Sequence, residues 1–83
     1  MTIEELTAAL ERAVTAGHTV ATFRYVKATG EAGSRKVFVT GVRVWFGRTL
    51  RHPDPGWLVD ALDPHGQATR VFAVGRMSDW TSA

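Results

Sequence analysis

Residues 57–77 read WLVDALDPHGQATRVFAVGRM and predict a β-hairpin. The four residues Asp63-Pro64-His65-Gly66 fit a type I turn, because proline is preset for its second position. The apolar residues before the turn predict a strand over Trp57–Leu62, and those after it predict a strand over Gln67–Val74. An isolated hairpin is barely stable in water, so the rest of the chain has to cover its apolar face.

Two arginines bracket the apolar part of the second strand. Because side chains alternate along a strand, Arg70, Phe72, Val74 and Arg76 are predicted to share one face. A guanidinium group donates two parallel hydrogen bonds to a phosphate and keeps its charge, so this face suits a phosphate-bearing ligand. Phe72 is either a platform for a stacked base or a core residue, and the arginines either contact a ligand or only reach solvent. The pattern leaves these alternatives open.

The beginning of the chain predicts an amphipathic helix over residues 2–16. Thr2 and Glu5 have the spacing of a capping box, and Gly17 is a typical helix stop. Its apolar stripe is expected to pack across the strands, with the acidic residues outside. The residues of that stripe are Ile3, Leu6, Leu10, Ala13 and Val14.

The remaining segments predict further strands around the hairpin. Residues 19–27 alternate as a strand, and residues 35–46 form a long β-prone run that could bend near Gly41. Residues 47–56 contain two prolines and predict a loop, and the tail 77–83 is expected to cover an open end with Trp80. The sequence therefore predicts one α+β domain over residues 1–83, a helix followed by a small bent antiparallel barrel of four to five strands.

Composition excludes several classes of protein. The 83 residues include no cysteine, which excludes disulfides and thiolate chemistry, and no apolar run approaches the roughly 20 residues of a membrane span. Residues 1–16 are acidic and helix-like rather than basic and apolar, so we expect a cytoplasmic location. Residues 17–76 hold nine Lys and Arg against four Asp and Glu, which suits a polyanionic partner but equally a solvated surface.

No catalytic constellation is evident. Asp60 and Asp63 leave opposite faces of a strand, and His18, His52 and His65 lack the spacing of a zinc site. Glycine-rich phosphate loops of the Walker and dinucleotide types are absent from the sequence. We expect a protein that binds rather than an enzyme, with no metal and no cofactor.

Three stretches resemble the WYL domain, a small module of bacterial regulators and defence systems. Phe23-Arg24-Tyr25 looks like the first strand of that family, Arg35-Lys36-Val37 is similar to the start of its second strand, and residues 57–77 match its hairpin most closely. Leu58 and Val59 stand where the name-giving tyrosine and leucine usually lie. The resemblance implies an SH3-like or Sm-like barrel that binds single-stranded DNA or RNA or a nucleotide-like ligand.

Taken with this resemblance, the arginine face predicts a ligand site. Arg70 and Arg76 are expected on phosphates with Arg35 assisting, and the loop around Arg48, Arg51 and His52 is either a further edge of the site or a solvated loop. The other candidates are Arg24 and Lys36 for phosphate contact, and Tyr25, Trp57 and Phe72 beside the ligand, each aromatic residue being alternatively core or rim.

A second hypothesis makes the chain a protein-interaction or dimerisation module. Trp45, Phe46 and Trp57 are several large apolar residues for so small a domain, and surplus apolar surface usually becomes an interface. A homodimer or docking on a larger partner is then expected, with the arginines only structural.

Overall fold

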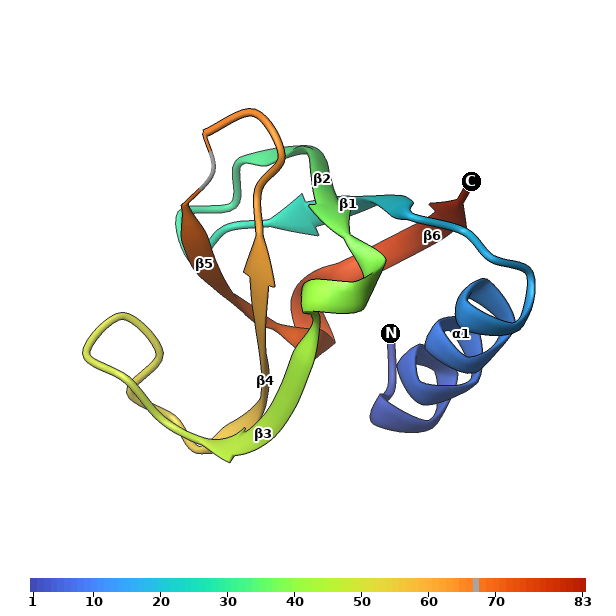
Figure 1. Ribbon diagram of the computed structural model, residues 1–83. Helices are drawn as coiled ribbons and strands as arrows, with labels where there is room; N and C mark the ends of the chain where they lie inside the picture. Colours follow the sequence, from blue (N-terminus) through green and yellow to red (C-terminus); the bar gives the residue numbers. More distant parts are fainter. Residues whose placement is uncertain (67) are drawn as a thin grey trace.

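The computed structural model describes residues 1–66 and 68–83, which fold into one helix and two three-stranded antiparallel sheets (Figure 1). One sheet has the strand order β2-β1-β6 and the other the order β3-β4-β5. The elements are α1 (Ile3–Thr15), β1 (Val20–Val26), β2 (Ala32–Phe38), the 3-10 turn η1 (Val39–Gly41), β3 (Arg43–Gly47), β4 (Gly56–Leu62), β5 (Thr69–Ala73), the 3-10 turn η2 (Val74–Arg76) and β6 (Met77–Ser82).

Helix α1 has the predicted ends. The Thr2 side chain accepts a hydrogen bond from the Glu5 backbone at 3.1 Å, and the Glu5 carboxylate accepts one from the Thr2 backbone at 2.9 Å. Gly17 then takes a left-handed conformation with φ of +72°, which glycine adopts without steric cost. These two local signals explain why the sequence predicted the helix within one residue at each end.

The buried face of α1 differs in part from the predicted stripe. Leu6 and Ala13 are buried as expected, but the third buried residue is Ala9, and Val14 is 63% exposed. The prediction for Val14 was wrong because the helix packs through its small residues against η1 and η2. The stripe of α1 that makes contact is therefore narrow and does not include Val14. Alanines let a helix lie close to the elements beneath it.

Two segments fold differently from the sequence prediction. The run 35–46 is two strands, β2 and β3, separated by η1, and the tail forms strand β6, which pairs with β1, rather than a cap. The described residues therefore contain six strands in two sheets, not four or five strands in one closed barrel. The hairpin of residues 57–77 is present as β4 and β5, although its predicted first residue after the turn, Gln67, lies outside the described residues.

The core lies between the two sheets and α1. The Phe23 ring makes edge contact with the Phe72 ring at a centroid distance of 5.2 Å and stacks on the indole of Trp80 at 5.9 Å. The hydroxyl of Tyr25, on β1, accepts a hydrogen bond of 2.9 Å from the backbone N–H of Ala73 at the end of β5. This bond joins the two sheets at the edge of the core.

Figure 1 shows α1 at one side of the molecule and the loop between β3 and β4 projecting from the opposite side. Among residues 1–66 and 68–83, no helix has the length and apolar character needed to cross a membrane.

Candidate ligand-binding groove

The β4–β5 hairpin sets the direction of Arg70. Arg70 lies opposite Ala61 and Phe72 opposite Val59, so alternation places all four on the face turned toward the core. Ala61, Val59 and Phe72 are buried, whereas Arg70 lies where the strand passes beyond the core and is exposed. Its Nε atom lies 3.6 Å from a carboxylate oxygen of Asp63 in the turn.

Arg76 does not continue this strand. Strand β5 ends at Ala73, and residues 74–76 form the 3-10 turn η2, so Arg70 and Arg76 do not share one face of a regular strand as predicted. Val74 in this turn is buried, and the turn leads from β5 in one sheet to β6 in the other. The two arginines nevertheless line one groove, because the bend brings η2 to the same side as β5.

This groove has a volume of about 800 Å³ and lies between the β1–β2 hairpin, the β3–β4 loop and strand β5. None of the described residues that line it is an aspartate or a glutamate. We call it the arginine groove after its five cationic lining residues, Lys27, Arg35, Arg51, Arg70 and Arg76. A groove lined by one sign of charge concentrates counter-ions of the opposite sign.

Only two of these cations have a carboxylate within 4.0 Å in the described part of the chain. Lys27 lies 3.8 Å from Glu31 and Arg70 lies 3.6 Å from Asp63, and both cationic side chains are well exposed. Exposed pairs of this kind contribute little free energy, about 0–1 kcal/mol. The guanidinium groups of Arg35, Arg51 and Arg76 therefore keep their capacity to bind an anion.

The Arg35 guanidinium lies against Gly33, two residues earlier in β2. A Cβ atom placed on Gly33 would lie 3.0 Å from Nη1 of Arg35, so the guanidinium lies directly over the bare backbone. The same Nη1 donates a hydrogen bond of 3.0 Å to the Ser34 carbonyl. Arg35 pairs with Phe23 across the strands and hence belongs to the inner face of its sheet, which leads into the groove.

The tip of the β3–β4 loop has a regular local structure. Thr49 and His52 exchange both backbone hydrogen bonds, at 2.9 and 3.1 Å, and the Thr49 hydroxyl also contacts the His52 ring at 3.1 Å. Arg51 is thus carried on a closed turn. Partial burial lowers the pKa of His52 below its ordinary value, and the charges of Arg76 and Arg51 lower it further. The guanidinium groups of Arg76 and Arg51 therefore lie close enough to His52 to lower its pKa.

Both predicted aromatic ligand contacts in the groove belong to the core. Phe72 is 5% exposed and Tyr25 is 6% exposed, and their rings are in edge contact at 5.0 Å. A ring buried in this way has no free face on which a base could stack. Of the alternatives left open for these two residues, the structure supports the core assignment.

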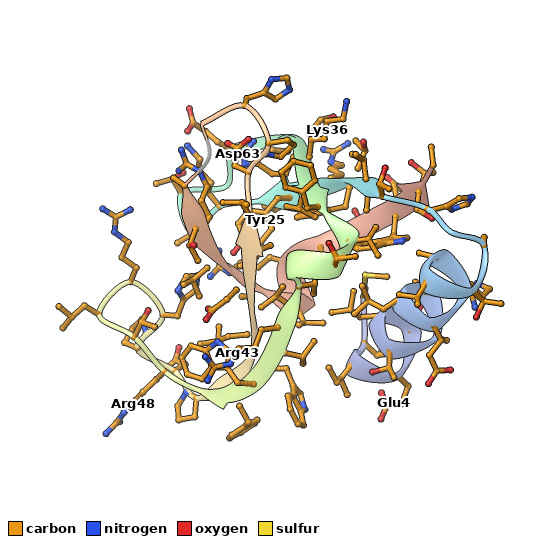
Figure 2. All side chains as sticks on the ribbon, in the orientation of Figure 1. Glu4, Tyr25, Lys36, Arg43, Arg48 and Asp63 are labelled. Carbon is orange, nitrogen blue, oxygen red and sulfur yellow. The ribbon has the colours of Figure 1, made fainter. Side chains whose placement is uncertain are left out.

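The remaining candidates lie elsewhere. Arg24 and Lys36 are on the outer face of the β2-β1-β6 sheet, because they alternate with the buried residues of their strands. Arg48 is exposed and does not line the groove, and Figure 2 shows it at the lower end of the molecule, far from Lys36 at the upper end. Trp57 lines a neighbouring pocket instead. Sequence reasoning missed Lys27, which follows β1 directly and carries no distinguishing pattern.

No protein-family model and no curated protein matches the chain. Function therefore has to be inferred from the geometry and charge of the groove. Within residues 1–66 and 68–83, no group of three or more metal-ligating side chains comes together. The groove offers hydrogen-bond donors and positive charge, which is the chemistry that binds anions.

Proposed function

We propose that this protein binds a single-stranded nucleic acid or a nucleotide through phosphate contacts in the arginine groove. The observation that carries the proposal is a groove with five cations and no lining acid, three of whose arginines have no carboxylate partner among the described residues. Arginine is suited to phosphate because its fork of donors matches two phosphate oxygens at once. The resemblance of residues 57–77 to the WYL hairpin supports the same ligand class.

We propose further that the fold is an open relative of the SH3-like barrel of WYL domains. This proposal is supported by the two 3-10 turns, η1 and η2, each of which connects one sheet to the other around a shared core. The hydrogen bond between Tyr25 and Ala73 then takes the place of a strand pairing at one junction of the sheets.

A charge-reversal experiment tests the groove. Fluorescence anisotropy with a short labelled oligothymidylate measures affinity as the salt concentration is raised. If three arginines each neutralise one phosphate, log K falls with log salt at a slope of about −2, at roughly −0.7 per phosphate on a single strand. We expect Arg51→Glu combined with Arg76→Glu to abolish binding at moderate salt, because both residues line the groove.

The matched control changes the same charge outside the groove. Arg24→Glu with Arg48→Glu replaces two exposed arginines that do not line it. This variant should bind with close to the wild-type affinity and slope. Equal losses in the two double variants would show that net charge, not the groove, attracts the oligonucleotide.

One observation favours a second function, docking of a protein partner. Phe46 is 61% exposed and Trp57 is 43% exposed, and the two rings pack edge to face at 5.4 Å near the free edge of the β3-β4-β5 sheet. Trp45 leaves the opposite face of β3, where its indole N–H donates a hydrogen bond of 2.9 Å to Asp60. Light scattering tests for a homodimer: a wild-type dimer that Phe46→Lys converts to a monomer would support this function.

A further inference from the structure

A second cavity lies directly beside the arginine groove. It has a volume of about 520 Å³ and shares Arg51, His52 and Arg76 with the groove as a common wall. Its other walls are mostly apolar, unlike those of the groove. We call it the Trp57 pocket, and its apolar lining includes Ile3, Pro53, Trp57, Leu58 and Val74.

The indole of Trp57 contacts the Phe46 ring and is not covered by it. Trp57 lies opposite Phe46 in the pairing of β4 with β3, and the two rings meet at an interplanar angle of 79°. Nearly half of the Trp57 surface stays exposed, while Leu58 and Val74 in the same pocket are 2% exposed. The pocket thus combines an exposed aromatic wall with buried aliphatic residues of the fold.

The charged wall and the apolar wall together indicate the chemistry of a ligand that could occupy both cavities. The shared wall carries two arginines, so a group lying against it should be anionic. The far side of the pocket is aromatic and aliphatic, so a group lying there should be flat and weakly polar. The pocket has one carboxylate in its lining, Asp54, which can accept a hydrogen bond from an amino group but disfavours a second anion.

We infer that the Trp57 pocket holds the base of a nucleoside phosphate whose phosphate group lies on Arg51 and Arg76. This inference rests on the proposed function and adds to it where the base is read and by which residue. Tyr25 and Phe72 are buried and cannot stack on a ligand, so Trp57 is the candidate aromatic residue from the sequence that keeps an exposed ring. The groove and the pocket form one site with a phosphate part and a base part.

Three probes separate the parts of this site. Adenosine 5′-monophosphate carries base, sugar and phosphate, ribose 5-phosphate lacks the base, and a short oligoadenylate carries the same base within a strand. Calorimetry with the whole chain should give an adenosine monophosphate affinity on the order of 5- to 150-fold above that of ribose 5-phosphate, the range expected for one stacked base. An oligoadenylate that binds tighter still identifies a strand as the ligand, and one that binds no tighter identifies a free nucleotide; both outcomes support the base pocket.

Variants at Trp57 test whether the indole causes the higher affinity for adenosine monophosphate than for ribose 5-phosphate. Trp57→Ala should remove the preference for adenosine monophosphate over ribose 5-phosphate and leave the affinity for ribose 5-phosphate unchanged. Trp57→Phe should keep most of that preference. Val14→Ala is the control, because Val14 is an exposed apolar residue of α1 that does not line the pocket. Circular dichroism of each variant verifies the fold, and Trp57→Leu, which keeps an apolar side chain but has no ring, replaces Trp57→Ala if that variant does not fold.

The outcomes separate this inference from the proposed function. Equal wild-type affinities for adenosine monophosphate and ribose 5-phosphate, or an unchanged preference in Trp57→Ala, overturn the base pocket but leave the arginine groove intact. If none of the three probes binds, the proposed function fails and the base pocket with it.

Discussion

Replacing Tyr25 by phenylalanine distinguishes a structural role of this residue from a role in ligand binding. The change removes one oxygen and keeps the ring, so the edge contacts with Phe72 at 5.0 Å and Phe23 at 6.4 Å remain. What is lost is the acceptor of the 2.9 Å hydrogen bond from the Ala73 backbone N–H. That N–H is partly buried at the junction of the two sheets and is left without its partner.

The expected cost follows from this geometry. A donor without a partner costs about 1–3 kcal/mol when it is buried, and the lower end of this range applies to the partly buried Ala73 N–H; the ring stays, so it leaves no cavity. For a domain of this size, each 1 kcal/mol lowers the melting temperature by about 4–8 °C. We therefore expect Tyr25→Phe to melt at least about 4 °C below the wild type and to bind the labelled oligonucleotide as the wild type does.

The assay is thermal unfolding followed by circular dichroism, together with anisotropy at one salt concentration. Thr40→Ala is the control, since it removes an exposed hydroxyl from η1. A Tyr25→Phe variant that melts with the wild type but loses oligonucleotide affinity would refute this reasoning and place the hydroxyl on the ligand.

Leu6→Ala should lower the free energy of unfolding by about 2–5 kcal/mol, because Leu6 is fully buried, while Val14→Ala on the exposed face should change it by less than about 0.5 kcal/mol; equal urea midpoints would contradict the packing of α1. Gly47→Ala places a Cβ 2.6 Å from the Trp45 ring and should cost about 1–3 kcal/mol, with a change in near-ultraviolet circular dichroism as the indole moves. The pKa of His52 is lowered in the folded state, so its contribution to stability is present above about pH 6.5 and is lost as the pH falls; His52→Gln should flatten the wild-type decline between about pH 7.5 and 5, and parallel pH profiles would contradict this.

The elements that sequence analysis predicted well carry their signals within a few residues. The capping box at Thr2 and the glycine stop at Gly17 fix both ends of α1, and the Asp63-Pro64 turn fixes the β4–β5 hairpin. The bend predicted near Gly41 is present as the 3-10 turn Val39–Gly41, but the β-branched residues there also suit a continuous strand, so the sequence did not predict that the run divides into two strands. Strand β6 could not be predicted locally, since its polar residues become a strand only by pairing with β1.

The site was predictable to a similar degree. Arg35, Arg70 and Arg76 do line one groove, but the chain bends at η2 to bring the last of them there, which strand alternation alone does not predict. Alternation predicts that Arg24 and Tyr25 leave opposite faces of β1, and the structure has Tyr25 buried and Arg24 exposed. The closed turn that carries Arg51 depends on backbone hydrogen bonds of Thr49 and His52, which residue types alone do not indicate.

The pairing of β1 with β6 also bears on how the chain reaches its fold. Strand β1 lies in the middle of its sheet, between β2 and β6. Strand β2 follows β1 directly in the chain, whereas the pairing of Ala21 with Ser82 in β6 joins residues separated by most of the chain. Hairpins form within about 1–10 μs, whereas a pairing across so long a loop waits for the loop to close. Until β6 arrives, the edge of Val20–Val26 is a strand rich in β-branched and aromatic residues with open hydrogen-bond groups. Refolding from denaturant should therefore lose protein to aggregation as the concentration rises, and a chain cut before β6 should aggregate even when dilute.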